Sequence, residues 1–375
     1  MKKIQMVDLQ TQYTKIKEEI DAGIAEVINS ASFIKGPKVA DFQAHLEQYT
    51  GAKHVINVGN GTDALQIALM GLGLQPGDEV ITPTFTFIAT AEVVALLGLT
   101  PVVVDVDWET MNMDIESVRR AITPHTKAIV PVHLFGQCAN MEAIMELAKE
   151  HHLYVIEDAC QAIGAQYTFS NGETKQAGTI GHIGCTSFFP SKNLGCYGDG
   201  GAIFTNDDEL ADKMQAIANH GCHIRYHHDE VGVNSRLDSI QAAILDAKLP
   251  HLNEYIAARQ KAAAYYDKAF ADNEKLLIPG REPHSTHVFH QYTLRVVGAD
   301  RDALREGLAA RGIPAMIYYP VPLHQQKAYL DPRYKDGDFP AAERLAACVL
   351  SLPMHTELDE EQLQFITSSV LDLIR

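Results

Sequence analysis

Features that mark membrane, secreted and zinc proteins are missing from this chain of 375 residues. No apolar run approaches 18 residues, so no membrane-spanning helix is predicted. Lys2 and Lys3 open the chain, but no apolar stretch of signal-peptide length follows them. We therefore expect reduced thiols in a cytoplasmic protein, because the six cysteines include no CxxC pair and no zinc-type spacing: Cys138, Cys160, Cys185, Cys196, Cys222 and Cys348.

Basic residues are also scarce. The chain has 31 Lys and Arg against 48 Asp and Glu, which gives a net charge of −17. Such an acidic surface argues against nucleic acid or a membrane as a partner. Apolar residues make up 46% of the chain and no low-complexity run occurs, which excludes a disordered protein. At roughly 150 residues per domain, the length predicts about two domains.

Short apolar runs alternate with helical segments between residues 50 and 205. This alternation is typical of an α/β fold whose mostly parallel sheet has helices on both faces. We count about seven strands, at residues 54–58, 79–82, 101–106, 128–132, 154–156, 185–189 and 201–205. Helices are predicted between them at residues 62–72, 89–97 and 141–151.

The two flanks of this region have a different pattern. Apolar spacing predicts helices at residues 8–30 and 39–49, and a longer helical stretch from 237 to about 271 that Pro250 interrupts. The remainder predicts a strand at 291–297, a helix at 301–311, a strand at 315–319 and then helices. We therefore expect a large α/β domain over residues 1–250, with the N-terminal helical segment, and a smaller C-terminal α+β domain over residues 251–375.

A glycine-rich turn joins the first predicted strand to its helix, at Gly59-Asn60-Gly61-Thr62-Asp63. The free amides and the dipole of a helix N-terminus can bind an anion such as phosphate. The alternative is an ordinary tight turn. The segment lacks the GxxxxGK[ST] pattern of nucleoside triphosphatases.

Two further segments carry an acid and a lysine. Asp158 follows an apolar strand, at the edge where open α/β sheets bind ligands, and either pairs with a ligand cation or metal or caps a helix. Lys192 lies in a loop rich in Ser, Gly and Asn and either forms a Schiff base or is a solvated lysine. The turn at residues 198–201 is interpreted as structural. A phosphate site, an acid and a lysine in this order match the needs of pyridoxal phosphate (PLP).

Several segments resemble the DegT-type PLP-dependent nucleotide-sugar aminotransferases. They are Gly61-Thr62-Asp63-Ala64-Leu65, Glu157-Asp158-Ala159-Cys160-Gln161 and Ser187-Phe188-Phe189-Pro190-Ser191-Lys192-Asn193-Leu194-Gly195, with Phe33-Ile34-Lys35-Gly36-Pro37 near the start and Tyr319-Pro320-Val321-Pro322-Leu323-His324 near the end. The resemblance implies a fold-type I PLP-dependent transferase, active as a homodimer with shared active sites.

The resemblance also implies roles for individual residues. Lys192 would be the Schiff-base lysine and proton shuttle, Asp158 the partner of the pyridine nitrogen, and Gln161 the neighbour of the 3′-oxygen. Phe87 would stack on the cofactor ring. The phosphate would be held by the backbone of Gly61, Thr62 and Asp63, by the hydroxyl of Ser187 and by Asn234 of the other subunit.

A narrower resemblance concerns residues 195–201, 225–228 and 231–236. They are similar to the WbpE type of the family, which transfers the amino group of L-glutamate to C3 of UDP-2-acetamido-2-deoxy-3-oxo-glucuronate for bacterial surface polysaccharide. Arg236 would then pair with a carboxylate of the sugar or of glutamate. Tyr318, Tyr319 and His324 would be substrate residues, although the WbpE type has His where this chain has Tyr318.

Other functions make different demands on the sequence. A 4-keto- or 3-keto-6-deoxy nucleotide sugar is the alternative substrate. A PLP sugar dehydratase would have His in place of Lys192, an amino-acid lyase would need no sugar site, and a regulatory protein would have a degenerate site. The cluster His220, Cys222, His223, His227 and His228 is interpreted as a polar loop and not a metal site, and His284, His287 and His290 as surface residues.

Overall fold

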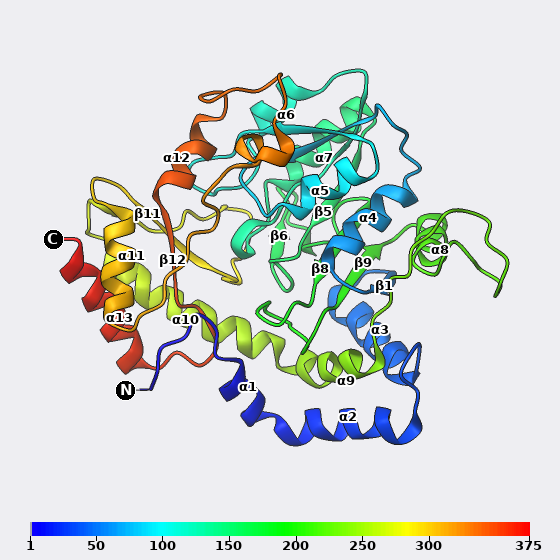
Figure 1. Ribbon diagram of the computed structural model, residues 1–375, viewed down its shortest axis with the longest axis horizontal. Helices are drawn as coiled ribbons and strands as arrows, with labels where there is room; N and C mark the ends of the chain where they lie inside the picture. The colour runs from blue at the N-terminus through cyan, green and yellow to red at the C-terminus, as the bar shows by residue number, and fades with distance from the viewer. Residues whose placement is uncertain (1) are drawn as a thin grey trace.

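A seven-stranded sheet forms the centre of the computed structural model, which describes residues 2–375 (Figure 1). The strand order is β1-β9-β8-β5-β4-β2-β3. Only β9 runs antiparallel to its neighbours, so the prediction of a mostly parallel sheet is confirmed. The strands are β1 (His54–Val58), β2 (Glu79–Pro83), β3 (Thr100–Val104), β4 (Thr126–Ile129), β5 (Tyr154–Asp158), β8 (Ile183–Ser187) and β9 (Gly201–Thr205).

Helices cover both faces of this sheet, because alternate strand residues point to opposite sides. Val155 packs with Phe42 in a core beneath α3, α7 and α9, whereas Ile156 packs with Leu65 in a second core beneath α4, α5 and α8. The helices are α3 (Pro37–Thr50), α4 (Gly61–Gly71), α5 (Ala89–Leu96), α6 (Ile115–Ala121), α7 (Met141–His151), α8 (Asp208–Ile217) and α9 (Ser239–Lys248).

The N-terminal helix is broken in two. We predicted one helix over residues 8–30, but α1 (Leu9–Lys15) ends before α2 (Lys17–Ser30) begins, because Ile16 leaves the helical region with φ −123° and ψ 26°. Its side chain is buried with Ile20 and Ile244 in a small apolar cluster. α2 therefore lies along α9, as Figure 1 shows at the bottom of the view.

A third core lies in the C-terminal part. There a three-stranded antiparallel sheet, β10-β11-β12, packs against helices, with Tyr266, Leu294 and Ile366 buried between them. Ile4 from the N-terminal segment belongs to the same core. The elements are α10 (Leu252–Phe270), β10 (Leu276–Leu277), β11 (Tyr292–Val296), α11 (Arg301–Ala310), α12 (Pro340–Cys348), β12 (Val349–Leu352) and α13 (Glu360–Leu373).

Pro250 lies in a short 3-10 segment, Leu249–His251, between α9 and α10, so the predicted interruption is confirmed. The domain boundary between residues 250 and 251 stays a prediction. No helix among residues 2–375 is long and apolar enough to cross a membrane.

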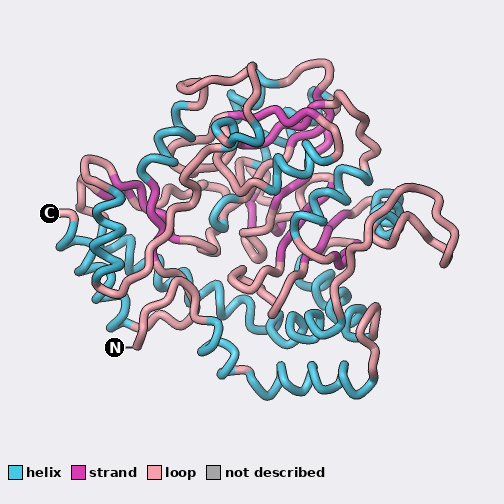
Figure 2. The backbone as a smooth tube through the Cα atoms, viewed as in Figure 1, coloured by secondary structure: helices cyan, strands magenta, loops and turns pink. Residues whose placement is uncertain are grey.

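One predicted strand is absent from the structure, and several observed strands were not predicted. Residues 315–319 form no strand, and only Met316 bridges to Ser351. Pro314 and Pro320 bound this segment and lack amide donors, and the chain turns toward the large sheet instead. We did not predict β12 or the hairpin of β6 (Gln166–Thr168) and β7 (Thr174–Gln176). Long loop segments, pink in Figure 2, connect the helices and strands of the C-terminal part.

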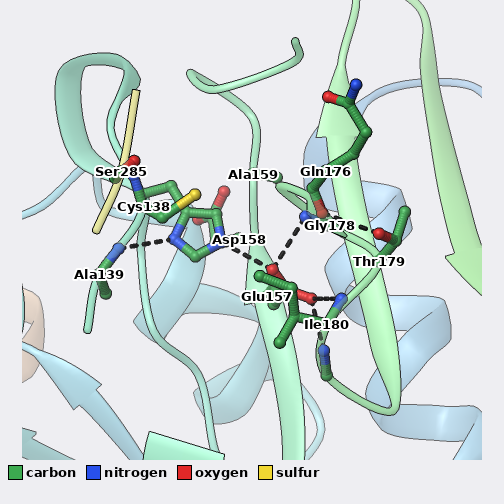
Figure 3. Close-up of polar contacts among 12 residues, drawn as sticks. Cys138, Ala139, Glu157, Asp158, Ala159, Gln176, Gly178, Thr179, Ile180 and Ser285 are labelled. Carbon is green, nitrogen blue, oxygen red and sulfur yellow. Dashed lines mark hydrogen bonds and ion pairs between the residues drawn. The ribbon is translucent and has the colours of Figure 1, made fainter. Parts of the chain in front are cut away.

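A buried carboxylate anchors the end of β5. Glu157 is fully buried and accepts hydrogen bonds from the backbone N–H of Gly178 (2.8 Å), Ile180 and Gly181 (both 2.6 Å), as Figure 3 shows. His133 Nε2 supplies a fourth donor at 2.8 Å, because its Nδ1 accepts from the amide of Ala139. The backbone N–H of His133 also donates to the carbonyl of Asp158. This network therefore holds both residues at the carboxyl end of β5.

A buried arginine ties α10 to the chain that follows it. Arg259 Nη1 donates to the carbonyls of Phe289 (3.1 Å), His290 (3.3 Å) and Met354 (3.0 Å). The next residue, His355, is buried as well. Burial lowers the pKa of His355 to about 4, and the charge of Arg259 acts in the same direction.

We predict that Glu157→Gln lowers the free energy of unfolding by about 3 kcal/mol, because the amide would turn an NH₂ group toward backbone N–H donors and leave them unpaired. Chemical denaturation measures the change. Glu150→Gln, at an exposed site, is the control and should stay within about 0.5 kcal/mol of the parent. A Glu157→Gln protein as stable as the control would contradict the anchoring role.

We also predict that His355 makes stability depend on pH. Its pKa is about 4 when folded and about 6.5 when unfolded, so below pH 6.5 only the unfolded chain takes up the proton. The contribution of His355 to the free energy of unfolding is intact above pH 6.5 and is lost as the pH falls toward 4. At pH 5 the loss is about 2 kcal/mol. Denaturation at pH 8 and pH 5 should show that His355→Gln loses less stability on acidification than the parent, whereas the exposed-site variant His125→Gln behaves like the parent. Equal losses in all three proteins would refute this.

Candidate active site

Three segments meet at one edge of the large sheet. β5 ends at Asp158 and its parallel neighbour β8 ends at Ser187, so the two residues lie at the same edge. The N-terminus of α4 comes very close to both strands. A Cβ on Gly61 would lie 2.8 Å from Cys160 Sγ and 2.8 Å from Ser187 Cβ, so only glycine permits this approach.

The start of α4 offers free hydrogen-bond donors. Asn60 caps the helix, and its Oδ1 accepts the N–H of Asp63 at 2.8 Å. The amides of Gly61 and Thr62 belong to the first turn and have no carbonyl partner within the helix. The predicted phosphate donors therefore lie together at Gly61, Thr62 and Ser187, while the Asp63 amide is occupied by Asn60. The Asp63 carboxylate accepts a hydrogen bond from Ser235 Oγ at 2.6 Å.

Asp158 is held by two donors. Its side chain is buried, Oδ2 accepts from Thr90 Oγ1 at 2.9 Å, and Oδ1 accepts from the amide of Cys160 at 3.2 Å. Thr90 lies in α5, and nothing in its sequence context distinguishes it from any other helical threonine. The two donors therefore fix the orientation of the carboxylate at the end of β5.

Lys192 follows β8 in a tight loop, where its backbone N–H donates to the carbonyl of Phe189 at 2.8 Å. Burial lowers the pKa of the Lys192 ammonium below its ordinary value, although Cys160 and Asp158 nearby act in the opposite direction. A lowered pKa increases the fraction of free amine, which is the nucleophilic form.

A second chain segment reaches this site from the C-terminal part. Gln161 Oε1 accepts from the amide of Phe135 at 2.8 Å, and its Nε2 donates to the hydroxyl of Tyr319 at 3.1 Å. Burial raises the pKa of the Tyr319 phenol, so it keeps its proton. Phe87 is 53% exposed, with its ring centroid 6.2 Å from that of Tyr319. Tyr318, joined to Tyr319 by a cis peptide bond, is half-buried beside it.

Asn234 and Arg236 form a separate group on the long loop between α8 and α9, which projects from the body of the protein in Figure 2. Arg236 Nε donates to Asn234 Oδ1 at 2.8 Å. Ser235 points inward, where its Oγ accepts from the amide of Gly59 at 2.8 Å and donates to Asp63. The loop thus contacts the start of α4 from the side.

His324 does not join these residues. It is buried, its Nδ1 lies 2.8 Å from Thr84 Oγ1, and its Nε2 lies 3.3 Å from Glu343 Oε1. These partners come from the turn after β2 and from α12. A substrate contact by His324 stays a prediction, and the observed contacts are internal.

The prediction that three histidines lie on the surface was wrong for two of them. His284 is exposed, but His287 and His290 are buried, and burial holds the pKa of each well below its usual value. The reason is a contact with the lysine loop, in which Asn193 Nδ2 donates to the carbonyl of Val288 at 2.9 Å. Among residues 2–375, no group of three His, Cys, Asp or Glu side chains could hold a metal ion.

Curated relatives match this chain along nearly its whole length. A UDP-2-acetamido-2-deoxy-3-oxo-D-glucuronate aminotransferase of Pseudomonas aeruginosa is 48% identical over 98% of this chain and 99% of its own. A pleiotropic regulatory protein of Geobacillus stearothermophilus is 48% identical over 99% of both chains. A UDP-N-acetyl-3-dehydro-α-D-glucosamine 3-aminotransferase of Acidithiobacillus ferrooxidans is 48% identical over 98% of this chain and 97% of its own.

Solved structures agree with the fold. DesV of S. venezuelae, in complex with a ketimine intermediate, superposes with a TM-score of 0.95 at 40% identity, covering 100% of this chain and 99% of its own. NtdA of Bacillus subtilis, with bound cofactor PMP, superposes with a TM-score of 0.90 at 31% identity, covering 100% of this chain and 86% of its own. The predicted fold-type I α/β architecture is confirmed by these neighbours.

The sequence profile of one family covers residues 14–371. This match includes every residue of the site described above. The chain therefore belongs to the DegT/DnrJ/EryC1/StrS aminotransferase family.

Proposed function

We propose that this protein is a PLP-dependent aminotransferase that moves the amino group of L-glutamate to the 3-keto carbon of UDP-2-acetamido-2-deoxy-3-oxo-glucuronate. The observation that carries the proposal is the convergence of Lys192, Asp158 and the open N-terminus of α4 at one sheet edge. The sugar is taken from the Pseudomonas aeruginosa relative. The product would serve the synthesis of bacterial surface polysaccharide such as lipopolysaccharide O-antigen.

The residues at this edge fit the cofactor. When bound, PLP supplies an aldehyde carbon that takes the amino group and a ring that accepts electrons from it. The amides of Gly61 and Thr62 and the hydroxyl of Ser187 would bind the phosphate, which the positive end of the α4 dipole would also attract. The Asp158 carboxylate would hold a proton on the ring nitrogen. A bulkier residue than Gly61 would fill the space between these donors.

The remaining residues orient the cofactor and move protons. Phe87 would stack on the ring, and the Gln161 amide would donate to the ring oxygen. Lys192, whose pKa is lowered by burial, would anchor the cofactor and afterwards move a proton at the carbon that gains or loses the amino group. Tyr318 and Tyr319 would line the side from which the sugar enters.

We also propose that the protein is a homodimer in which the two subunits share their active sites, and that it is located in the cytoplasm. The loop between α8 and α9 exposes Ile224, Tyr226 and Val231, which are 68%, 78% and 85% exposed and would be buried by a second copy. Asn234 lies on the same loop, and its Nδ2 can donate to the phosphate of the other subunit because only Oδ1 is used by Arg236.

A second substrate has specific support. The Acidithiobacillus ferrooxidans relative is equally identical to this chain, and its name specifies a 3-keto sugar without the carboxylate. Amination at the same carbon is common to both names. Both sugars should therefore be tested as amino acceptors in the same experiment. The Geobacillus stearothermophilus relative is named a regulatory protein. A regulatory protein could still bind the cofactor, so turnover is the readout that distinguishes an enzyme from it.

We predict that L-glutamate converts the bound cofactor to its amine form, seen as loss of the visible absorption band, and that UDP-3-oxo-N-acetylglucosaminuronate restores the band. Lys192→Ala should lose turnover by roughly a thousandfold or more, because the proton shuttle is gone. Lys53→Ala, at an exposed lysine, is the control and should retain turnover.

Each outcome of this panel is informative. If only UDP-3-oxo-N-acetylglucosamine restored the absorption band, the proposed reaction would stand but with a different substrate. If only a 4-keto-6-deoxy sugar restored the band, the amino group would be transferred to C4 and not to C3. Parent-like turnover in Lys192→Ala, or no response to any amino donor, would contradict the proposed function.

A further inference from the structure

A cavity of about 390 Å³ opens beside the α8–α9 loop, between the start of α3 and the end of α8. Its lining includes two permanent cations, Lys35 and Arg236, and one histidine, His223. No acidic residue is among the described residues that line it, although Asp212 just outside pairs with His223 at 3.5 Å. In a chain with a net charge of −17, a cavity with this lining is a candidate site for an anion. We call it the Lys35 cavity.

The two permanent cations of the Lys35 cavity are held by neutral groups. Lys35 Nζ donates to Asn219 Oδ1 at 2.8 Å, and Arg236 Nε donates to Asn234 Oδ1 at 2.8 Å. The two asparagines face each other in an isolated antiparallel bridge.

These contacts orient both cations without cancelling their charge. An amide oxygen carries no formal charge, and each cation keeps unused N–H donors. By contrast, Lys38, also on the α3 side, is paired with Glu26 at 2.8 Å. Two positive charges therefore remain uncompensated in the cavity wall.

The cavity is joined to the proposed cofactor site. Ser235 lines it, and the same hydroxyl bonds the Gly59 amide and the Asp63 carboxylate at the start of α4. A ligand in the cavity would thus lie against the loop that carries Asn234. The volume of the Lys35 cavity falls within the usual range for small-molecule sites, about 300–1,000 Å³.

We propose that the Lys35 cavity binds the diphosphate of the nucleotide-sugar substrate, an inference that rests on the proposed function. A diphosphate matches two separate cations, whereas a single carboxylate would leave one of them unmatched. The family resemblance implies a carboxylate partner for Arg236, but its guanidinium presents a planar fork of donors that suits phosphate oxygens equally. Lys35 is then a specificity residue for the nucleotide portion, distinct from the residues at Lys192 that carry the chemistry.

The test is titration of UDP into the full-length, cofactor-loaded enzyme by calorimetry at fixed salt. Lys35→Met should raise the Kd for UDP roughly five- to tenfold, through loss of one charge-assisted contact. It should also reduce the dependence of Kd on salt. Lys38→Met, at a lysine that is already paired with Glu26, is the matched control and should leave the Kd unchanged. Lys35→Gln, which keeps a donor for Asn219 but not the charge, should weaken UDP as Lys35→Met does.

Further arms identify the anion and keep the two proposals separate. Uridine, which lacks phosphate, should bind the parent and Lys35→Met equally. Unchanged UDP affinity in both Lys35 variants, or weakening confined to D-glucuronate, would overturn the assignment to a diphosphate. UDP binding needs no amino transfer. An enzyme that aminates the sugar but binds UDP normally after Lys35→Met would therefore refute this inference alone, whereas a parent enzyme without turnover would refute the proposed function.

Discussion

The buried Glu157 carboxylate is the contact on which the geometry of this molecule depends. A charge in the interior is tolerated only when its oxygens are fully hydrogen-bonded, and here three backbone amides and one imidazole supply the donors. Those donors come from the turn after β7 and from the segment after β4. One side chain therefore joins three segments at the centre of the sheet. The next residue is Asp158, whose side chain points to the opposite face.

The position of Asp158 follows from this arrangement. Its main chain is fixed on one side by Glu157 and His133, and its carboxylate is fixed on the other by Thr90 and Cys160. Because these hydrogen bonds are present without a ligand, the place of Asp158 beside the loop of Lys192 and the start of α4 does not depend on one. Preorganisation of this kind lowers the cost of orienting a charged ligand.

Local patterns were sufficient for much of the fold. The strands at residues 54–58 and 201–205 and the helix at 141–151 agree with the structure to the residue. Each strand is a short apolar run, and the helix buries Met141, Ile144, Leu147 and Ala148 at helical spacing. The strand at 315–319 failed because prolines and distant contacts decide that segment. Likewise, β12 directly follows a helix, and its apolar residues continue the helical pattern.

The candidate site was predictable to a similar degree. Gly61, Asp158 and Lys192 could be found because each sits at a recognisable strand end or turn, whereas Ser187 was found through the family resemblance. Thr90, Ser235 and the contact of Gln161 with Phe135 could not, since they join segments that are far apart in the sequence. His290 is buried in a segment that contacts Asn193, more than ninety residues away in the sequence. The spacing of the histidines could not predict this contact.

The orientation of Gln161 has a consequence for ligand selection. The backbone N–H of Phe135 occupies its carbonyl oxygen, so the side-chain amide cannot rotate by half a turn without losing that bond. Toward the site it can only give a hydrogen bond. A ring hydroxyl placed there must turn its own hydrogen away or release it, whereas an ionised oxygen is received directly. At the proposed cofactor site the amide would therefore favour an ionised ring oxygen over a hydroxyl, and the backbone N–H of Phe135 would set this preference.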